Sequence, residues 1–190
     1  TKYGYDAYQR TGVTEANQSG ALRRTTTTTH LNNTSALPQT VTMPSTSGGT
    51  YVKQLVTTYS PGTYQVASQS VTGFDGNGVG IPARTTLFLD YDPDAGLPKK
   101  IVGPRSGIND DTNLTYWNES SPGVACATVG GGACGQLKTV TNALQQTTTF
   151  DLYEPDGRLK QMTDPNGLVT TYGYDSRGRL EGVSEAGTAR

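Results

Sequence analysis

Residues 174–180 read Tyr-Asp-Ser-Arg-Gly-Arg-Leu, and residues 153–159 read Tyr-Glu-Pro-Asp-Gly-Arg-Leu with the same spacing of Tyr, Gly, Arg and Leu. Residues 135–137, Gly-Gln-Leu, continue the pattern upstream. A fixed period of about 20 residues is typical of proteins in which each repeat is one supersecondary element stacked on its neighbours. The sequence therefore indicates a repeat protein.

The spacing Asp-x-x-Gly identifies the repeating element. In Asp164–Gly167 and Asp175–Gly178, the Asp can accept a hydrogen bond from the backbone two residues on, and the Gly can take the left-handed conformation that closes a bulged hairpin. Glu154–Gly157 is a third turn of this kind. About six residues lie between turns, which is enough for a strand of ~20 Å. Each repeat is predicted to be two antiparallel strands with two turns.

The composition agrees with this element. Thr accounts for 31 of 190 residues, Gly for 24 and Tyr for 11, whereas Leu, Ile, Val and Phe together number 33. Thr and Tyr favour strands, and Gly favours turns. A helical bundle, a coiled coil and an α/β enzyme with an aliphatic core are excluded. We predict an all-β fold of antiparallel β-hairpin repeats joined into a curved, twisted sheet with a modest core.

Charge and hydropathy exclude two classes of partner. With 15 basic and 16 acidic residues, the chain has no electrostatic footprint for nucleic acid. No apolar run approaches the ~18 residues of a membrane-spanning helix. We therefore expect neither a nucleic-acid partner nor a membrane span.

The repeat degenerates towards the N-terminus. Residues 3–6, Tyr-Gly-Tyr-Asp, match residues 172–175 one for one, and a further Tyr-Asp pair stands at 91–92. We read 1–29 as degenerate repeat units, and Asn32–Gly49 as a surface loop. The remaining stretches are 30–83 with divergent Thr/Ser/Gly-rich repeats and loop insertions, 84–134 with degenerate repeats and a cysteine-containing insertion, and 135–190 with regular repeats. All four form one continuous repeat domain, expected to be part of a longer chain.

Tyr-Asp-x-x-Gly-Arg-Leu at this period resembles the YD repeat of the Rhs family, which includes bacterial Rhs and toxin-complex B/C shell proteins, wall-associated bacterial proteins and animal teneurins. The residues that carry the resemblance are Tyr5, Asp6, Tyr91, Asp92, Tyr153, Gly157, Arg158, Leu159, Asp164, Gly167, Tyr174, Asp175, Gly178, Arg179 and Leu180. The resemblance implies hairpins joined edge to edge into a strip that spirals into a hollow shell or barrel. In polymorphic toxins of the family, such a shell encloses a cytotoxic domain.

Three classes of function follow as hypotheses. The first is a non-enzymatic structural segment of a YD-repeat shell that encloses or displays a toxin or effector domain in a secreted or cell-surface bacterial protein. The second is an extracellular adhesion or carbohydrate-binding module that can assemble with itself. The third is a hydrolase, but the sequence contains no recognisable hydrolase motif. Expected partners are the rest of a longer YD-repeat polypeptide or copies of the chain through edge-strand pairing, and an enclosed toxin domain or a surface glycan.

A few aromatic and ionisable residues are candidates for binding or catalysis. Tyr116 and Trp117 are candidates for stacking on a sugar ring, although aromatics in a sheet more often pack across strands. His30 is the single histidine and forms no metal cluster. Residues 90–94, Asp-Tyr-Asp-Pro-Asp, begin like a calcium loop, but they also fit a YD turn at Asp92 with one extra residue. No catalytic residue, metal or cofactor is expected.

The two cysteines lie in the insertion. Cys126 and Cys134 enclose a Gly-rich segment that can close a short loop. We predict a disulfide between them, worth ~2–3 kcal/mol at most, in an exported protein. The alternative is a pair of free thiols in a reducing cytosol.

Overall fold

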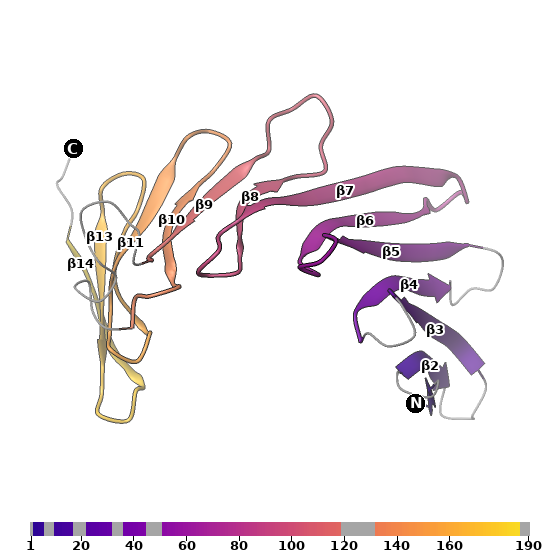
Figure 1. The fold of residues 1–190 in the computed structure, drawn as a ribbon, viewed down its shortest axis with the longest axis horizontal. Helices are drawn as coiled ribbons and strands as arrows, with labels where there is room; N and C mark the ends of the chain where they lie inside the picture. The colour runs from indigo at the N-terminus through magenta and orange to yellow at the C-terminus, as the bar shows by residue number, and fades with distance from the viewer. Residues whose placement is uncertain are drawn as a thin grey trace. The chain divides into compact units, whose positions relative to one another are not determined.

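The computed structural model describes residues 2–5, 10–16, 22–31, 36–44, 51–118 and 132–186. These residues form fourteen β-strands and no helix, so no helix long and apolar enough to cross a membrane occurs among them (Figure 1). The strands are β1 (Lys2–Tyr5), β2 (Arg10–Ala16), β3 (Leu22–His30), β4 (Pro38–Pro44), β5 (Val52–Tyr59), β6 (Val66–Phe74), β7 (Gly80–Tyr91), β8 (Pro98–Val102), β9 (Thr112–Tyr116), β10 (Leu137–Thr141), β11 (Thr147–Tyr153), β12 (Leu159–Thr163), β13 (Val169–Tyr174) and β14 (Leu180–Ala186). The predicted all-β class is confirmed.

The chain divides into two compact units, Thr1–Leu87 and Phe88–Arg190. Within the first unit, each strand from β1 to β7 pairs antiparallel with the next strand along the chain. Within the second unit, the same holds from β8 to β14. The predicted arrangement of hairpins joined side by side is therefore confirmed in each unit. The division into four sequence stretches stays a prediction.

One sequence expectation was wrong. The presumed loop Asn32–Gly49 contains the strand β4, in which Thr40 pairs with Val56 and Val41 with Leu55. The prolines that suggested a loop occupy the first and last positions of this strand. Proline is tolerated at such positions because its missing N–H takes no ladder bond from the centre of the sheet.

Five hairpin turns share one backbone geometry. The first residue of each turn donates its N–H to the carbonyl of the fifth, and the fourth residue donates back to the carbonyl of the first. The fourth residue has a positive φ, between 62° and 87°. The turns begin at Asp75, Asn142, Glu154, Asp164 and Asp175. The bulged hairpin that the Asp-x-x-Gly spacing predicts is thus present. It also occurs at Asp75, where residues 73–82 were expected to form a Gly-rich turn, and at Asn142, which the sequence pattern did not single out.

The turn at Asp92 follows the same plan with one more residue. Asp92 donates its N–H to the carbonyl of Leu97, and Gly96, with φ 67°, donates to the carbonyl of Asp92. The sequence interpretation of a YD turn with one extra residue is confirmed.

Hydroxyl pairs replace much of the apolar packing expected in a sheet. Directly opposed Thr and Ser side chains on neighbouring strands lie within hydrogen-bonding distance, and each such pair adds a few tenths of a kcal/mol or more to strand pairing. The pairs are Thr58 and Ser68 (2.8 Å), Ser70 and Thr85 (2.6 Å), Thr115 and Thr139 (2.7 Å), and Thr141 and Thr147 (2.8 Å). This pairing explains how a Thr-rich chain with few aliphatic residues forms ordered strands.

The left-handed position of the turns yields a test of stability. Gln145 holds φ 62°, where a side chain costs ~1–2 kcal/mol that glycine does not pay. Since glycine loses ~0.5–1 kcal/mol more backbone entropy on folding, we expect Gln145→Gly to stabilise the fold by about 0.5 kcal/mol. Urea unfolding followed by circular dichroism measures the change.

Gly167→Ala is the matched control. Gly167 has φ 85°, and nothing lies within 4 Å of the position that a Cβ would take. No side-chain contact changes, so the variant should lose the backbone strain less the gain in unfolded-state entropy, a net loss of about 0.5–1 kcal/mol. If both substitutions shift stability in the same direction, the left-handed residue does not control these turns.

Candidate functional site

The sequence motif converges on one edge of the second unit. Tyr116, Tyr153 and Tyr174 end the strands β9, β11 and β13, and each is followed by a turn. Because successive strands run antiparallel, these three turns lie on the same edge of the sheet. We call this edge, with its tyrosines and turns, the Tyr-turn edge.

Four strand-ending tyrosines donate their hydroxyl to the first carbonyl of the preceding strand. In all four cases the acceptor lies two residues beyond the last residue of that strand that pairs with the tyrosine's own strand. The pairs are Tyr59 to Pro38 (2.8 Å), Tyr116 to Pro98 (2.8 Å), Tyr153 to Leu137 (2.7 Å) and Tyr174 to Leu159 (2.7 Å). The hydroxyl thus extends the contact between the two strands past the last pair of their ladder and supplies the carbonyl with a hydrogen-bond donor.

Burial keeps these hydroxyls protonated. Tyr116 and Tyr153 are 6% and 7% exposed. Burial raises the pKa of Tyr153 to about 12, and it also raises the pKa of Tyr116 and of Tyr59 in the first unit. All three phenols are therefore hydrogen-bond donors throughout the physiological pH range.

The Asp of the motif caps the turn. In Asp175, Oδ1 accepts the backbone N–H of Arg177 and of Arg179, both at 2.9 Å, and Oδ2 accepts Nε of Arg179 at 2.8 Å. Asp164 accepts the N–H of Asn166 and of Leu168, both at 2.8 Å. The backbone N–H and then the guanidinium of Arg179 lower the pKa of Asp175, and the N–H of Leu168 lowers that of Asp164. Both carboxylates therefore act as hydrogen-bond acceptors for the backbone of their own turns.

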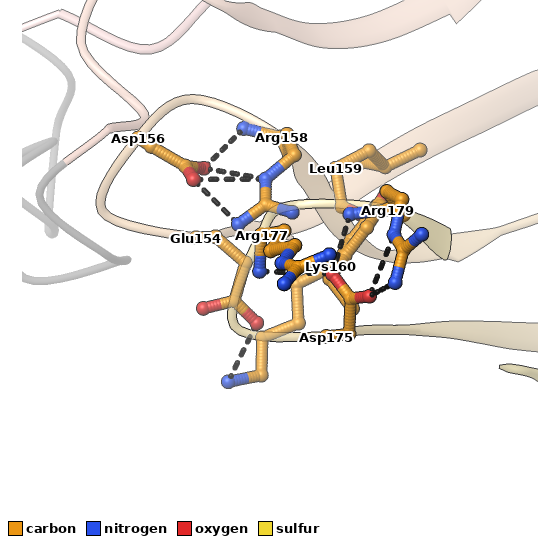
Figure 2. A network of polar contacts seen from close by, with 9 residues as sticks. Glu154, Asp156, Arg158, Leu159, Lys160, Asp175, Arg177 and Arg179 are labelled. Carbon is orange, nitrogen blue, oxygen red and sulfur yellow. Dashed lines mark hydrogen bonds and ion pairs between the residues drawn. The ribbon is translucent and has the colours of Figure 1, made fainter. Parts of the chain in front are cut away.

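The turn beginning at Glu154 distributes its charges differently. Glu154 pairs with Lys160 (3.3 Å), and the capping role passes to Asp156, whose Oδ1 accepts the backbone N–H of Arg158 at 3.2 Å (Figure 2). The same carboxylate holds Nε of Arg158 at 2.8 and 2.9 Å. The turns at Glu154, Asp164 and Asp175 therefore each have an acidic cap, but in the Glu154 turn the cap lies two residues later.

Arg158 joins its own turn to the next one. Its guanidinium lies 4.4 Å from the centre of the Tyr174 ring, within the range of a cation–π contact. Its buried Nη1 has no hydrogen-bond partner and lies 2.8 Å from the position that a Cβ on Gly178 would occupy. Gly178 is thus required both for its φ of 80° and for the space that it leaves to Arg158.

A similar contact occurs at two other places, where the residue just before a strand lies against the glycine of the next turn on the same edge. Gln136, which precedes β10, brings Nε2 to 3.0 Å from the Cβ position of Gly157. In the first unit, Tyr51 precedes β5, and its ring fills the space beside Gly78. At these three places the residue before a strand packs on the glycine of the following turn at the same edge, whereas Gly135 has nothing within 4 Å.

The cysteine-containing insertion enters through one of these turns. Trp117 donates its N–H to the carbonyl of Gln136 (2.9 Å), and Gly135 donates to the carbonyl of Trp117 (2.7 Å). These are the two bonds of the five regular turns, so Trp117 occupies the Asp position and 118–134 replaces the two central residues. Cys126 lies outside the described residues, and its disulfide with Cys134 stays a prediction.

Tyr116 and Trp117 are packing residues in the structure. Trp117 is 7% exposed, forms a buried cluster with Ala133 and Tyr153, and donates Nε1 to the carbonyl of Phe150 at 3.0 Å. The ammonium of Lys138 lies 4.3 Å from the centre of its ring. This burial favours cross-strand packing of the two aromatics over sugar stacking.

The remaining candidate residues occupy separate places. Asp92 is 5% exposed, and its Oδ1 accepts the N–H of Asp94 (3.1 Å) and of Ala95 (2.9 Å), which is the geometry of a turn cap. Across the described part of the chain, no three His, Cys, Asp or Glu side chains gather as a metal site. Tyr5 ends β1 and His30 ends β3, whereas Asp6 falls outside the described ranges.

Sequence reasoning placed the motif residues but missed what the tyrosines and Arg158 contact. The Tyr acceptors lie 15 to 21 residues upstream. The signal that could have found them is the coincidence of a strand-ending Tyr with the Leu or Pro that opens the preceding strand.

The tyrosine hydroxyls yield a stability test. Tyr153→Phe and Tyr174→Phe each remove one hydrogen bond to a backbone carbonyl, and we expect each to lower the free energy of unfolding by ~1 kcal/mol. Tyr172→Phe is the control, because its hydroxyl reaches only the weak acceptor Sδ of Met162 at 3.3 Å. Equal losses in all three variants, measured by urea unfolding, would contradict the role assigned to the strand-ending tyrosines.

The turn carboxylates yield a pH test. Because the folded state lowers the pKa of Asp175, this group contributes stability above its ordinary pKa of 3.8, and that contribution is lost as pH falls through the lowered value. Asp175→Asn should flatten the loss of stability between about pH 5 and pH 2. Asn keeps the turn bonds, as Asn142 does by accepting the N–H of Leu144 (2.9 Å) and Gln146 (3.1 Å).

Glu185→Gln on the exposed strand β14 is the charge-matched control. It should leave the acid profile as steep as that of the unmodified chain. An Asp175→Asn profile that follows the unmodified chain would remove the turn carboxylate from the acid response.

Several solved structures are similar to this chain. Two solved toxin complexes resemble the chain in structure: TcdB2-TccC3-Cdc42, with 16% identity and a TM-score of 0.49, and the Tc holotoxin pore of Photorhabdus luminescens, with 15% identity and a TM-score of 0.49. In each case the match covers 93% of this chain and 10% of the other, so this chain spans about a tenth of those proteins. No curated protein matches the chain.

One protein-family model matches the part of the chain with the most regular repeats. The model described as RHS Repeat matches residues 153–190, which include the turns at Glu154, Asp164 and Asp175. Residues 153–190 are therefore similar to the RHS repeat, and the resemblance that the Tyr-Asp motif implied is confirmed for this part of the chain.

Proposed function

We propose that the chain is a non-enzymatic structural segment of a YD-repeat shell that encloses or displays a toxin or effector domain in a secreted or cell-surface bacterial protein. The observation that carries the proposal is the use of the motif's polar groups. The Tyr hydroxyls bond backbone carbonyls, the Asp carboxylates bond backbone N–H groups, and Arg158 covers the next turn. Groups that a hydrolase would present to a substrate are occupied in holding one hairpin to the next.

The pairing pattern also suits a wall. Each strand pairs only with its neighbours along the chain, and the contacts of one repeat recur in the next. A structure of this kind lengthens by adding repeats, without a central core that limits its size. Such growth is what an enclosure for a separate domain requires.

Exposed aromatics in the first unit favour the second candidate, an adhesion or carbohydrate-binding module. Tyr51, Tyr64 and Phe74 are 44%, 54% and 42% exposed, and the rings of Tyr51 and Phe74 lie 5.2 Å apart at an angle of 56°. Aromatic faces of this kind can stack on sugar rings. In this candidate the glycan surface is formed by Tyr51 and Phe74 instead of Tyr116 and Trp117.

Protease protection tests the shell function. In the complete gene product that contains these residues, we expect an enclosed domain to resist protease under native conditions. Tyr153→Phe combined with Tyr174→Phe weakens two contacts between strands, so it should speed cleavage of that domain about 10-fold or more if local opening admits the protease.

Tyr172→Phe provides the matched control and should leave the cleavage rate nearly unchanged. Cleavage of the adjoining domain at the rate of an isolated domain would contradict enclosure. Specific binding on a glycan array that Tyr51→Ala abolishes would instead support the adhesion candidate.

A further inference from the structure

The three residues that lead from the insertion back towards β10 lie against the next repeat. We call these residues, Gly-Ala-Cys at 132–134, the strap. A Cβ on Gly132 would collide with the carbonyl oxygen of Glu154 and with the backbone nitrogen of Gly157. Glycine permits this close approach of two backbones because it has no side chain. The strap thus joins the turn between β9 and β10 to the turn between β11 and β12.

Ala133 covers two aromatic rings at this place. It is 0% exposed and packs with Trp117 and Tyr153, which are each 7% exposed. Its carbonyl oxygen accepts the N–H of Gln136 at 2.9 Å. Burial of both rings therefore depends on the strap staying in place.

Cys134 differs from the residue before it because it is exposed. It is not a free thiol. Its predicted partner is Cys126, the other cysteine of the chain. An exposed sulfur is open to attack by a thiolate, and disulfides that are accessible in this way are the labile ones.

We propose that a disulfide between Cys126 and Cys134 is a redox-sensitive latch that holds the strap on the neighbouring repeat. A dithiol reductant supplies the two electrons: its first thiolate attacks Sγ of Cys134, the S–S bond breaks, and Cys126 leaves as a thiolate that takes up a proton. The second thiolate of the reductant then displaces the Cys134 thiolate, which is protonated in turn. The chain is left with two thiols and the reductant with a disulfide. The latch goes beyond the proposed shell function and does not depend on it.

The crosslink favours the docked strap by its effect on the detached form. Cys126 and Cys134 close a short ring, which removes conformations that the detached segment could otherwise adopt. Reduction restores those conformations to the detached form. The detached fraction should therefore rise about 50- to 100-fold on reduction.

The sheet itself should survive reduction. β9 and β10 pair through residues outside the strap, among them Leu114 with Val140 and Thr115 with Thr139. The change is therefore confined to the Tyr-turn edge, where release of the strap uncovers Trp117. This separates a local latch from a disulfide on which the whole fold depends.

The single tryptophan of the chain, Trp117, reports on the strap. When dithiothreitol is added to the folded full chain, its fluorescence should shift to longer wavelength and acrylamide should quench it more strongly, because the ring meets water. Hydrogen exchange of the Gln136 amide, which is bonded to the strap, should quicken by about 50- to 100-fold. The amide of Gly167, which closes a regular turn on the opposite edge, is the internal control and should exchange at an unchanged rate.

Three variants separate the latch from the strap. Cys126→Ser cannot form the disulfide, so its fluorescence should match that of the reduced chain with or without dithiothreitol. Gly132→Ala keeps both cysteines but brings a Cβ against the next turn, so it should expose Trp117 even when oxidised. Gly182→Ala is the matched control: nothing lies within 4 Å of its Cβ position, and it should respond to reduction as the unmodified chain does.

Four results would overturn the latch. They are two reactive thiols in the unreduced chain, a disulfide-linked dimer on a non-reducing gel, unchanged Trp117 fluorescence on reduction, and loss of the strands by circular dichroism on reduction. The last two are measured on the unmodified chain, so the test does not depend on the folding of any variant.

Discussion

The hydrogen bond from a strand-ending tyrosine to the first carbonyl of the preceding strand is the contact on which the hairpin arrangement depends. It recurs in both units at 2.7 to 2.8 Å, in each of the four cases two residues past the end of the ladder between the two strands that it joins. A chain with 33 Leu, Ile, Val and Phe residues among 190 has little apolar area to bury. Directed polar bonds at strand ends and Thr hydroxyl pairs within the sheet therefore hold neighbouring strands together.

The turns tolerate varied sequences because backbone geometry defines them. The first position holds Asp, Asn or Glu in the five regular turns, and Trp117 where the insertion enters. In each, the same two backbone bonds close the turn, so 118–134 can be accommodated without disturbing β9 and β10. The side chain at the first position adjusts stability, whereas the left-handed residue before the next strand makes the return possible.

The sequence was most informative where a turn has both Asp and Gly, as at Asp164 and Asp175. It failed at Asn142, because Gln145 takes the left-handed conformation without being glycine. It also failed at β4, where two prolines suggested a loop although they stand only at the strand ends. The tyrosine and Arg158 contacts could not be predicted from the alternation of side chains along a strand. That alternation only assigns each side chain to a face of the sheet, whereas these contacts join different strands and turns.

Glycines at the two edges of the second unit obey different constraints. At Gly157 and Gly178, on the Tyr-turn edge, a Cβ would meet Gln136 or Arg158, whereas Gly167 on the opposite edge has nothing within 4 Å. A residue that tolerates positive φ can therefore replace the last glycine, but not the first two without displacing a neighbouring side chain. The last two turns of the Tyr-turn edge are thus fitted to the repeat before them, through one side chain that lies against the turn glycine. Gly135, in the turn after Tyr116 on the same edge, has nothing within 4 Å, so this fit belongs to the regular repeats and not to the whole edge.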